Sequence, residues 1–264
     1  MCERGRLYLV GIGPGDHRQL TQRAREAIAE ADTVVGYKTY LRLLDGLLDG
    51  KQVVASAMRE ELDRCAEACR LAMAGRRVAL ISSGDPGVYG MAGPTYELLF
   101  HAGWRPATGV VVEVVPGVTA LTACAALVGA PLTHDFCAIS LSDLLTPWEV
   151  IEKRLSAAAM ADFVTALYNP RSGRRDWQLL RAREIFLQHR SPATPVAVVS
   201  AAFRDRQQCE ITTLDGLDRS EPGMQSTVLI GNSRTRSRDG LLVTPRGYGD
   251  KYDLERGLAA GVTP

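Results

Sequence analysis

Three glycine-rich segments, each at the end of an apolar run, are the residues of this sequence best suited to binding a small molecule. They are GIGPGD (Gly11–Asp16), SSGDPGVYGMAG (Ser82–Gly93) and VVPGVTA (Val114–Ala120). Glycines let backbone amides and carbonyls approach a ligand closely, and a proline stiffens the first loop. Open α/β sheets bind ligands at loops that follow buried strands. The pattern therefore predicts one ligand site built from three loops.

The first loop differs from two familiar phosphate-binding loops. Its glycines resemble a dinucleotide fingerprint, but Asp16 stands where that fingerprint needs a small residue. A carboxylate at a helix start would repel a pyrophosphate. Neither Lys38 nor Lys51 lies in the GxxxxGK[ST] pattern of a Walker-type loop. The sequence favours a ligand without phosphate, and the alternative is a tight turn that binds nothing.

Composition and charge narrow the class of protein. The chain has 264 residues, of which 46% are hydrophobic and 23% charged, as in ordinary globular proteins with room for two domains. A formal net charge of only +1 argues against a nucleic-acid surface. The sequence contains no long apolar segment and no CxxC pair, so we expect a cytoplasmic protein with reduced thiols. Cys65 and Cys69 fit a buried helix face better than a metal site, and no metal is predicted.

The elements that must position the loops alternate along the first half of the chain. We expect strands at 33–35 and 78–81 and helices that begin near Thr21, Glu60 and Pro94, which together predict a parallel sheet. The segment Thr146–Glu149 has the pattern of a capping box with proline at the first helical position.

The second half of the chain has a different pattern. Its apolar runs are short and closely spaced, which predicts a partly antiparallel sheet. They lie at 163–168, 196–200, 209–213 and 227–230. The predicted fold class is α/β with two α/β domains. The first covers residues 1–116, the second 117–248, and 249–264 form a weakly structured tail.

The three loops together resemble the tetrapyrrole methylase family, the class III S-adenosylmethionine-dependent methyltransferases. Four further segments are similar to members of that family that act in cobalamin biosynthesis: His134–Leu155, Leu167–Ser172, Val228–Arg236 and Val243–Tyr248. The resemblance extends in collinear order over residues 6 to 248. It implies two domains with the cofactor in the cleft between them, usually as a homodimer. The implied reaction is C-methylation of a tetrapyrrole with contraction of its ring.

The resemblance also implies which residues contact the cofactor. Those in and after the three loops are Pro14, Ser83, Gly84, Asp85, Val88, Thr119 and Ala120. Tyr168 and Gly231, at strand ends of the second domain, complete the set, although related enzymes often carry methionine in place of Tyr168. The carboxylate of Asp85 would meet the ribose or the amino-acid end of the cofactor, or would cap its own helix.

The implied substrate is a ring that carries many carboxylates, and arginine binds carboxylates in a bidentate manner. The residues within the matching motifs that suit this substrate are Asn169, Arg171 and Arg246. Ring contraction needs a proton acceptor for a hydroxyl group. Tyr37, Asp16 and His134 are the candidates, and Tyr37 is favoured because it follows a strand end near the first loop.

Three alternatives remain open. The same family contains enzymes for cobalt-containing rings, and no residue separates these from enzymes for metal-free rings. An RNA ribose methyltransferase of the same fold is disfavoured by the near-zero net charge. A protein that binds a porphyrin-like ligand without catalysis is the third.

Overall fold

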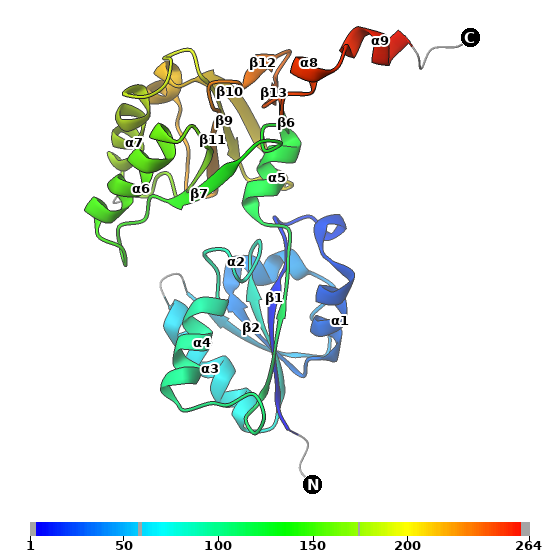
Figure 1. The fold of residues 1–264 in the computed structure, drawn as a ribbon. Helices are drawn as coiled ribbons and strands as arrows, with labels where there is room; N and C mark the ends of the chain where they lie inside the picture. Colours follow the sequence, from blue (N-terminus) through cyan, green and yellow to red (C-terminus); the bar gives the residue numbers. More distant parts are fainter. Residues whose placement is uncertain (1–3, 58–59, 174, 260–264) are drawn as a thin grey trace. The chain divides into compact units, whose positions relative to one another are not determined.

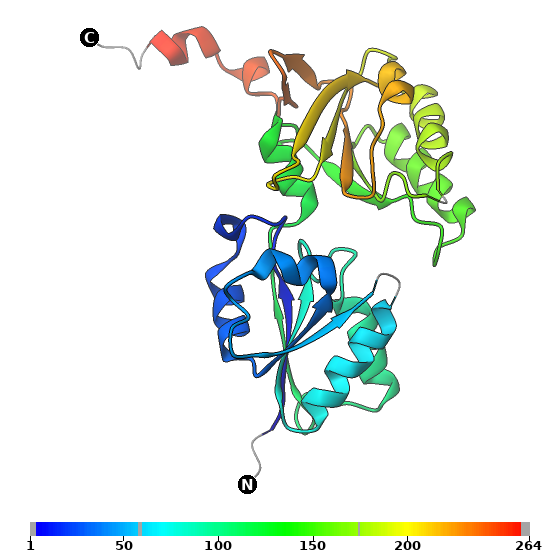
Figure 2. The same cartoon turned by 180° about the vertical axis from the view of Figure 1, so that it is seen from behind.

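The computed structural model describes residues 4–57, 60–173 and 175–259, and the chain divides into two compact units. One unit is Met1–Ala123 with Phe203–Asp205, and the other is Cys124–Ala202 with Arg206–Pro264. Each unit has its own five-stranded sheet flanked by helices (Figures 1 and 2). The division falls within α5 (Ala120–Leu127), a few residues after the domain boundary predicted from the sequence.

The first unit contains a fully parallel sheet. Its strands are β1 (Arg6–Gly11), β2 (Thr33–Tyr37), β3 (Gln52–Ser56), β4 (Arg77–Ser82) and β5 (Val111–Val115). Their order is β3-β2-β4-β1-β5, and every neighbouring pair is parallel. The predicted parallel sheet is confirmed. Because all five strands run the same way, all five carboxyl ends lie at one edge of the sheet.

Helices cover both faces of this sheet, with α1 on one face and α3 and α4 on the other (Figure 1). They are α1 (Gln22–Glu30), α2 (Lys38–Leu41), α3 (Glu61–Met73) and α4 (Ala92–His101). Alternate residues of β1 belong to different cores, since Tyr8 packs in the cluster with α1 and Leu9 in the cluster with α3 and α4. α1 begins next to Thr21 as predicted, and the Thr21 side chain caps it by accepting a hydrogen bond from the amide of Ala24 at 3.2 Å.

The second unit has a mixed sheet, which confirms the prediction of partly antiparallel pairing. Its strands are β7 (Phe136–Ser140), β8 (Val164–Tyr168), β9 (Pro195–Ser200), β10 (Gln208–Thr213) and β11 (Ser226–Ile230), in the order β10-β9-β11-β8-β7. β7 is parallel to β8, whereas β11 is antiparallel to both β8 and β9. The carboxyl ends of β7, β8 and β9 therefore share one edge, and that of β11 lies at the other.

Helices α6 (Trp148–Met160) and α7 (Gln178–Leu187) pack in the core of this unit, which also has a small second sheet. The small sheet consists of β6 (Gly129–Ala130), β12 (Arg236–Arg238) and β13 (Leu241–Val243), in the order β12-β13-β6. None of the described helices is both long and apolar enough to cross a bilayer.

Two local predictions were wrong. Pro147, not Thr146, occupies the N-cap of α6, and no side chain caps that helix. The segment predicted as a weakly structured tail contains α8 (Tyr248–Lys251) and α9 (Leu254–Ala259). The carboxylate of Asp253 accepts hydrogen bonds from the amides of Glu255 and Arg256 at 3.0 and 3.1 Å, an N-terminal cap that the sequence analysis overlooked.

Candidate active site

The three glycine loops follow β1, β4 and β5, which are neighbours in the parallel sheet. The first two loops continue the backbone pairing beyond the ends of their strands. The amide of Ile12 donates to the carbonyl of Ser82 at 3.0 Å, and Gly13 and Gly84 exchange hydrogen bonds of 3.1 and 2.8 Å. Both glycines have left-handed φ angles, +69° and +66°, which favour glycine. The predicted convergence of these loops is therefore present in the fold.

The third loop packs against the other two through glycine backbones. A Cβ atom on Gly117 would lie 2.2 Å from the carbonyl oxygen of Gly84 and 2.7 Å from the carbonyl carbon of Gly11. A Cβ atom on Gly84 would lie 3.7 Å from Cα of Thr119 and 3.8 Å from the amide nitrogen of Ala120. The three loops therefore pack against one another through main-chain atoms.

Asp85 ties the second loop to the third. One carboxylate oxygen accepts from the amide of Gly87 at 2.7 Å, and the other accepts from the amide of Gly117 at 3.0 Å. From the sequence, this carboxylate is expected to contact the cofactor or to cap its own helix. In the structure its two oxygens are held by backbone amides of two loops, so Asp85 positions the site.

The cofactor residues predicted in the first half of the chain lie together at this edge of the sheet. Pro14 is in the first loop, Ser83, Gly84, Asp85 and Val88 are in the second, and Thr119 and Ala120 follow the third.

The three candidate proton acceptors lie in different surroundings. Asp16 accepts hydrogen bonds from both the amide and the guanidinium of Arg18, at 2.8 and 2.7 Å, which lower its pKa to about 2. A carboxylate with so low a pKa is a weak base. Tyr37 ends β2, at the same edge as the glycine loops, and its ring meets that of Tyr40 edge-on at 5.1 Å.

His134 does not lie at the edge where Tyr168 ends its strand. It precedes β7, which is parallel to β8, so it lies at the amino-terminal edge of the second sheet. Its Nδ1 atom accepts a hydrogen bond from the amide of Asp135 at 2.8 Å. His134 and Tyr168 therefore lie at opposite edges of the second sheet.

Tyr168 and Asn169 lie at the carboxyl edge of the second sheet, as predicted. Tyr168 pairs in register with Ser140, and the side-chain amide of Asn169 donates to the Ser140 hydroxyl at 3.0 Å. Asn169 has a φ of +52°, which turns the chain sharply at the strand end. The exposed Arg171 follows two residues later.

Gly231 and Arg246 are not brought to that edge. Ile230 pairs with Thr165, at the start of β8, so Gly231 lies at the opposite edge from Tyr168. Thr235 packs against Gly231, and its hydroxyl lies 2.8 Å from the hydroxyl of Thr244, two residues before Arg246. Because β11 is antiparallel to β8, Tyr168 and Gly231 lie at opposite edges of the second sheet.

Ala201 also lies at the carboxyl edge of the second sheet, a position that the sequence pattern did not predict. It follows β9, whose carboxyl end lies at the same edge as Tyr168, and it has a left-handed φ of +47°. Alanine rarely adopts this conformation, so the sequence carries no signal for a turn at this position. The directions of β8 and β9 show that Ala201 and Tyr168 share an edge of the sheet.

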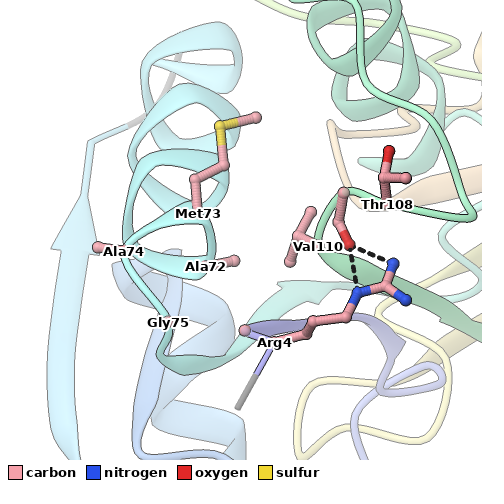
Figure 3. A pocket seen from close by; sticks show the side chains of 9 residues that line it. Arg4, Ala72, Met73, Ala74, Gly75, Thr108 and Val110 are labelled. Carbon is pink, nitrogen blue, oxygen red and sulfur yellow. Dashed lines mark hydrogen bonds between the residues drawn. The ribbon is translucent and has the colours of Figure 1, made fainter. Parts of the chain in front are cut away.

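The first unit has a pocket at each edge of its sheet. One, of about 500 Å³, lies at the carboxyl ends of β2 and β3 and includes Tyr37. The other, of about 450 Å³, lies at the amino-terminal edge near Arg4 (Figure 3). There the Arg4 guanidinium donates to the carbonyls of Gly109 and Pro106, both at 2.9 Å, so its charge is engaged within the fold. The pocket that includes Tyr37 lies at the same edge of the sheet as the glycine loops.

The cysteines on α3 are poor metal ligands. Cys65 and Cys69 are buried in the core, and burial raises the pKa of both thiols, that of Cys69 to about 11. A metal would require the thiolate. Over the described part of the chain, no group of three or more His, Cys, Asp or Glu side chains could hold a metal ion.

Residues 6–218 match the family of Tetrapyrrole (Corrin/Porphyrin) Methylases, and the chain belongs to this family. It is 54% identical to the cobalt-factor III methyltransferase of Priestia megaterium over 96% of this chain and 47% of that protein. It is 50% identical to the probable cobalt-factor III C(17)-methyltransferase of Salmonella typhimurium over 92% of this chain and 99% of that protein. The chain thus spans about half of the first relative and nearly all of the second.

A third relative and two solved structures extend the comparison. The precorrin-3B C(17)-methyltransferase of a Sinorhizobium species is 45% identical over 92% of this chain and 97% of that protein. The crystal structure of the methyltransferase CobJ has a TM-score of 0.84 at 38% identity and covers 91% of this chain and 100% of that one. The uroporphyrin-III C-methyltransferase of Thermus thermophilus complexed with S-adenosylhomocysteine has a TM-score of 0.63 at 26% identity, covering 86% and 97%.

Proposed function

We propose that this chain is an S-adenosylmethionine-dependent C-methyltransferase of corrin biosynthesis, which methylates C17 of precorrin-3B and contracts the ring to give precorrin-4. The observation that carries the proposal is the 45% identity to a precorrin-3B C(17)-methyltransferase over nearly the full length of both chains. The cobalt-containing ring of the oxygen-independent pathway is a second candidate substrate, because two relatives at 54% and 50% identity are named for cobalt-factor III.

The geometry of the three loops supports S-adenosylmethionine as the methyl donor. This cofactor is a sulfonium cation without phosphate, and the loops bring Pro14, Ser83, Gly84, Val88, Thr119 and Ala120 to one edge of the parallel sheet. A free carboxylate pressed on the sulfonium would stabilise the ground state and slow methyl transfer. The carboxylate of Asp85 is instead hydrogen-bonded to two backbone amides.

For the second unit, we propose that Tyr168 contributes to the cofactor site and that Asn169 and Arg171 contact substrate carboxylates. The support is that Tyr168 ends β8 and that Asn169 and Arg171 follow directly after it. Gly231, His134 and Arg246 do not share this edge, and we leave them out of the proposed site. Catalysis would then depend chiefly on holding the nucleophilic ring carbon in line with the methyl group.

Tyr37 is the proposed proton acceptor for ring contraction. Replacing Tyr37 by phenylalanine should lower the rate of ring-contracted product by about 100-fold or more, the usual contribution of a positioned acid or base, without changing cofactor affinity. Rates are measured by product absorption and mass. Tyr40→Phe is the matched control, because Tyr40 packs beside Tyr37 and burial raises its pKa. Parental turnover in Tyr37→Phe would show that another group takes the proton.

The reaction itself is tested with purified protein, labelled methyl donor and either the metal-free or the cobalt-containing ring. We expect one labelled methyl group in the product, with the mass and absorption of a contracted ring, together with S-adenosylhomocysteine. Failure to form S-adenosylhomocysteine with either ring would favour a binding protein. A salt-sensitive gel shift with ribosomal RNA would favour the RNA-modifying alternative.

We also propose that the protein works as a homodimer in the cytoplasm. The described cysteines Cys65, Cys69, Cys124, Cys137 and Cys209 are all free, which suits a reducing compartment. The homodimer follows from the family resemblance, and sedimentation equilibrium of the purified chain measures it directly.

A further inference from the structure

The pocket at the carboxyl ends of β2 and β3 is enriched in positive charge. Its volume of about 500 Å³ lies within the range of small-molecule sites, roughly 300–1,000 Å³. The residues that line it are Tyr37, Lys38, Thr39, Arg42, Ala55, Ser56 and Ala57. Lys38 and Arg42 are exposed at its mouth. Two cations on so small a lining attract anions.

A third cation, Arg64 of α3, lies behind the lining. Its side chain is only 4% exposed, yet its guanidinium donates to the Ser56 hydroxyl at 2.7 Å and lies 5.8 Å from the centre of the Tyr37 ring. Within the described structure its Nε atom is buried and has no hydrogen-bond partner. A buried guanidinium group with an unused donor is costly unless another group satisfies it.

Acidic groups compensate this charge only in part. Glu61 lies 3.5 Å from Arg64, but its side chain is half exposed. Glu60 accepts a hydrogen bond from the amide of Ala57 at 2.8 Å. Neither carboxylate is among the residues that line the pocket, so the described residues of the lining carry two positive charges and no negative one.

We propose that this pocket binds carboxylate side chains of the tetrapyrrole substrate, an inference that rests on the proposed function. The pocket lies at the same edge of the sheet as the glycine loops, and β3 is three strand positions from β1, or roughly 14 Å at the usual strand spacing. That reach suits a wide ring with several acidic arms. Carboxylates would take charge-assisted hydrogen bonds from Lys38 and Arg42, with Arg64 behind them. Tyr37, the proposed proton acceptor, would then face the bound ring.

Binding of uroporphyrin, a stable ring with eight carboxylates, tests the pocket. The double variant Lys38→Ala/Arg42→Ala should bind uroporphyrin about tenfold more weakly than the parent, while its affinity for S-adenosylmethionine is unchanged. Porphyrin fluorescence gives the first affinity and calorimetry the second. The uroporphyrin octamethyl ester should bind both proteins equally weakly. In turnover, KM for the ring substrate should rise more than kcat falls.

The matched control is Arg70→Ala/Arg105→Ala, which removes the same net charge from exposed positions elsewhere in the first unit. If the pocket variant and the control bind uroporphyrin equally well, the inference is wrong.

The inference is also wrong if inorganic phosphate displaces uroporphyrin from the parent protein and propionate at the same concentration does not, since the site would then be one for phosphate. If the parent protein methylates the ring and the pocket variant has an unchanged KM for the ring substrate, this inference is refuted and the proposed function is not. A parent that neither binds nor methylates any tetrapyrrole refutes the proposed function as well.

Discussion

Gly117→Ala should weaken the binding of S-adenosylmethionine at least tenfold and destabilise the first unit by about 1–3 kcal/mol, the usual cost of overpacking. The new methyl group would lie 2.2 Å from the Gly84 carbonyl oxygen and 2.8 Å from the Gly11 carbonyl oxygen. Both neighbours are backbone atoms in loops that are hydrogen-bonded to each other, so relief requires the loops to move apart. Calorimetric titration and thermal unfolding measure the two effects.

Gly93→Ala is the matched control for this substitution. Gly93 lies in the first turn of α4, and a Cβ atom there would have no neighbour within 4 Å. Alanine is favoured over glycine in helices by up to about 1 kcal/mol, so the control should be neutral or slightly stabilising. Parental affinity and stability in Gly117→Ala would mean that the three loops are not as tightly packed as described.

Arg190→Met should destabilise the second unit by about 3–5 kcal/mol, the range for a buried charge network that loses one partner. The Arg190 side chain is 1% exposed. Its guanidinium donates to the carbonyls of Gly231, Ala158 and Phe163, and it lies 4.7 Å from the centre of the Phe186 ring. One side chain thus joins the end of α6, the approach to β8 and the end of β11.

Methionine would preserve most of the packing volume but would remove the guanidinium hydrogen bonds to all three carbonyls. The free energy of unfolding is measured in urea, with Arg154→Ala on the exposed face of α6 as the control, expected within about 0.5 kcal/mol of the parent. A loss of less than about 1 kcal/mol in Arg190→Met would contradict this account.

The shared position of the three glycine loops in the first unit could be predicted from sequence, because the architecture of this unit follows from local patterns. Strands that alternate with helices must be parallel, so the loops after β1, β4 and β5 share an edge by topology. The hydrogen bonds of Asp85 were not predictable in the same way. They depend on how close the third loop comes to the second loop. That distance is decided by packing between segments that are distant in the sequence.

The edge at which each residue of the second unit lies could not be predicted from local sequence patterns alone. A short apolar run predicts a strand but not its direction, which is decided by pairing with strands far away in the sequence. β11 runs against β8 and β9, so Gly231 lies away from Tyr168. His134 lies away from it for a simpler reason, because it precedes its strand instead of following it.

The close packing of the glycine loops limits how this domain can be altered. Gly13 is hydrogen-bonded to Gly84, and Asp85 to Gly117, so each loop is fitted to the backbone of its neighbours. A chimera that takes one glycine loop from a distant relative would pack that loop against two loops of this protein with which it did not evolve. Exchange of all three loops together would keep their mutual packing, so they should be transferred as a set in protein engineering.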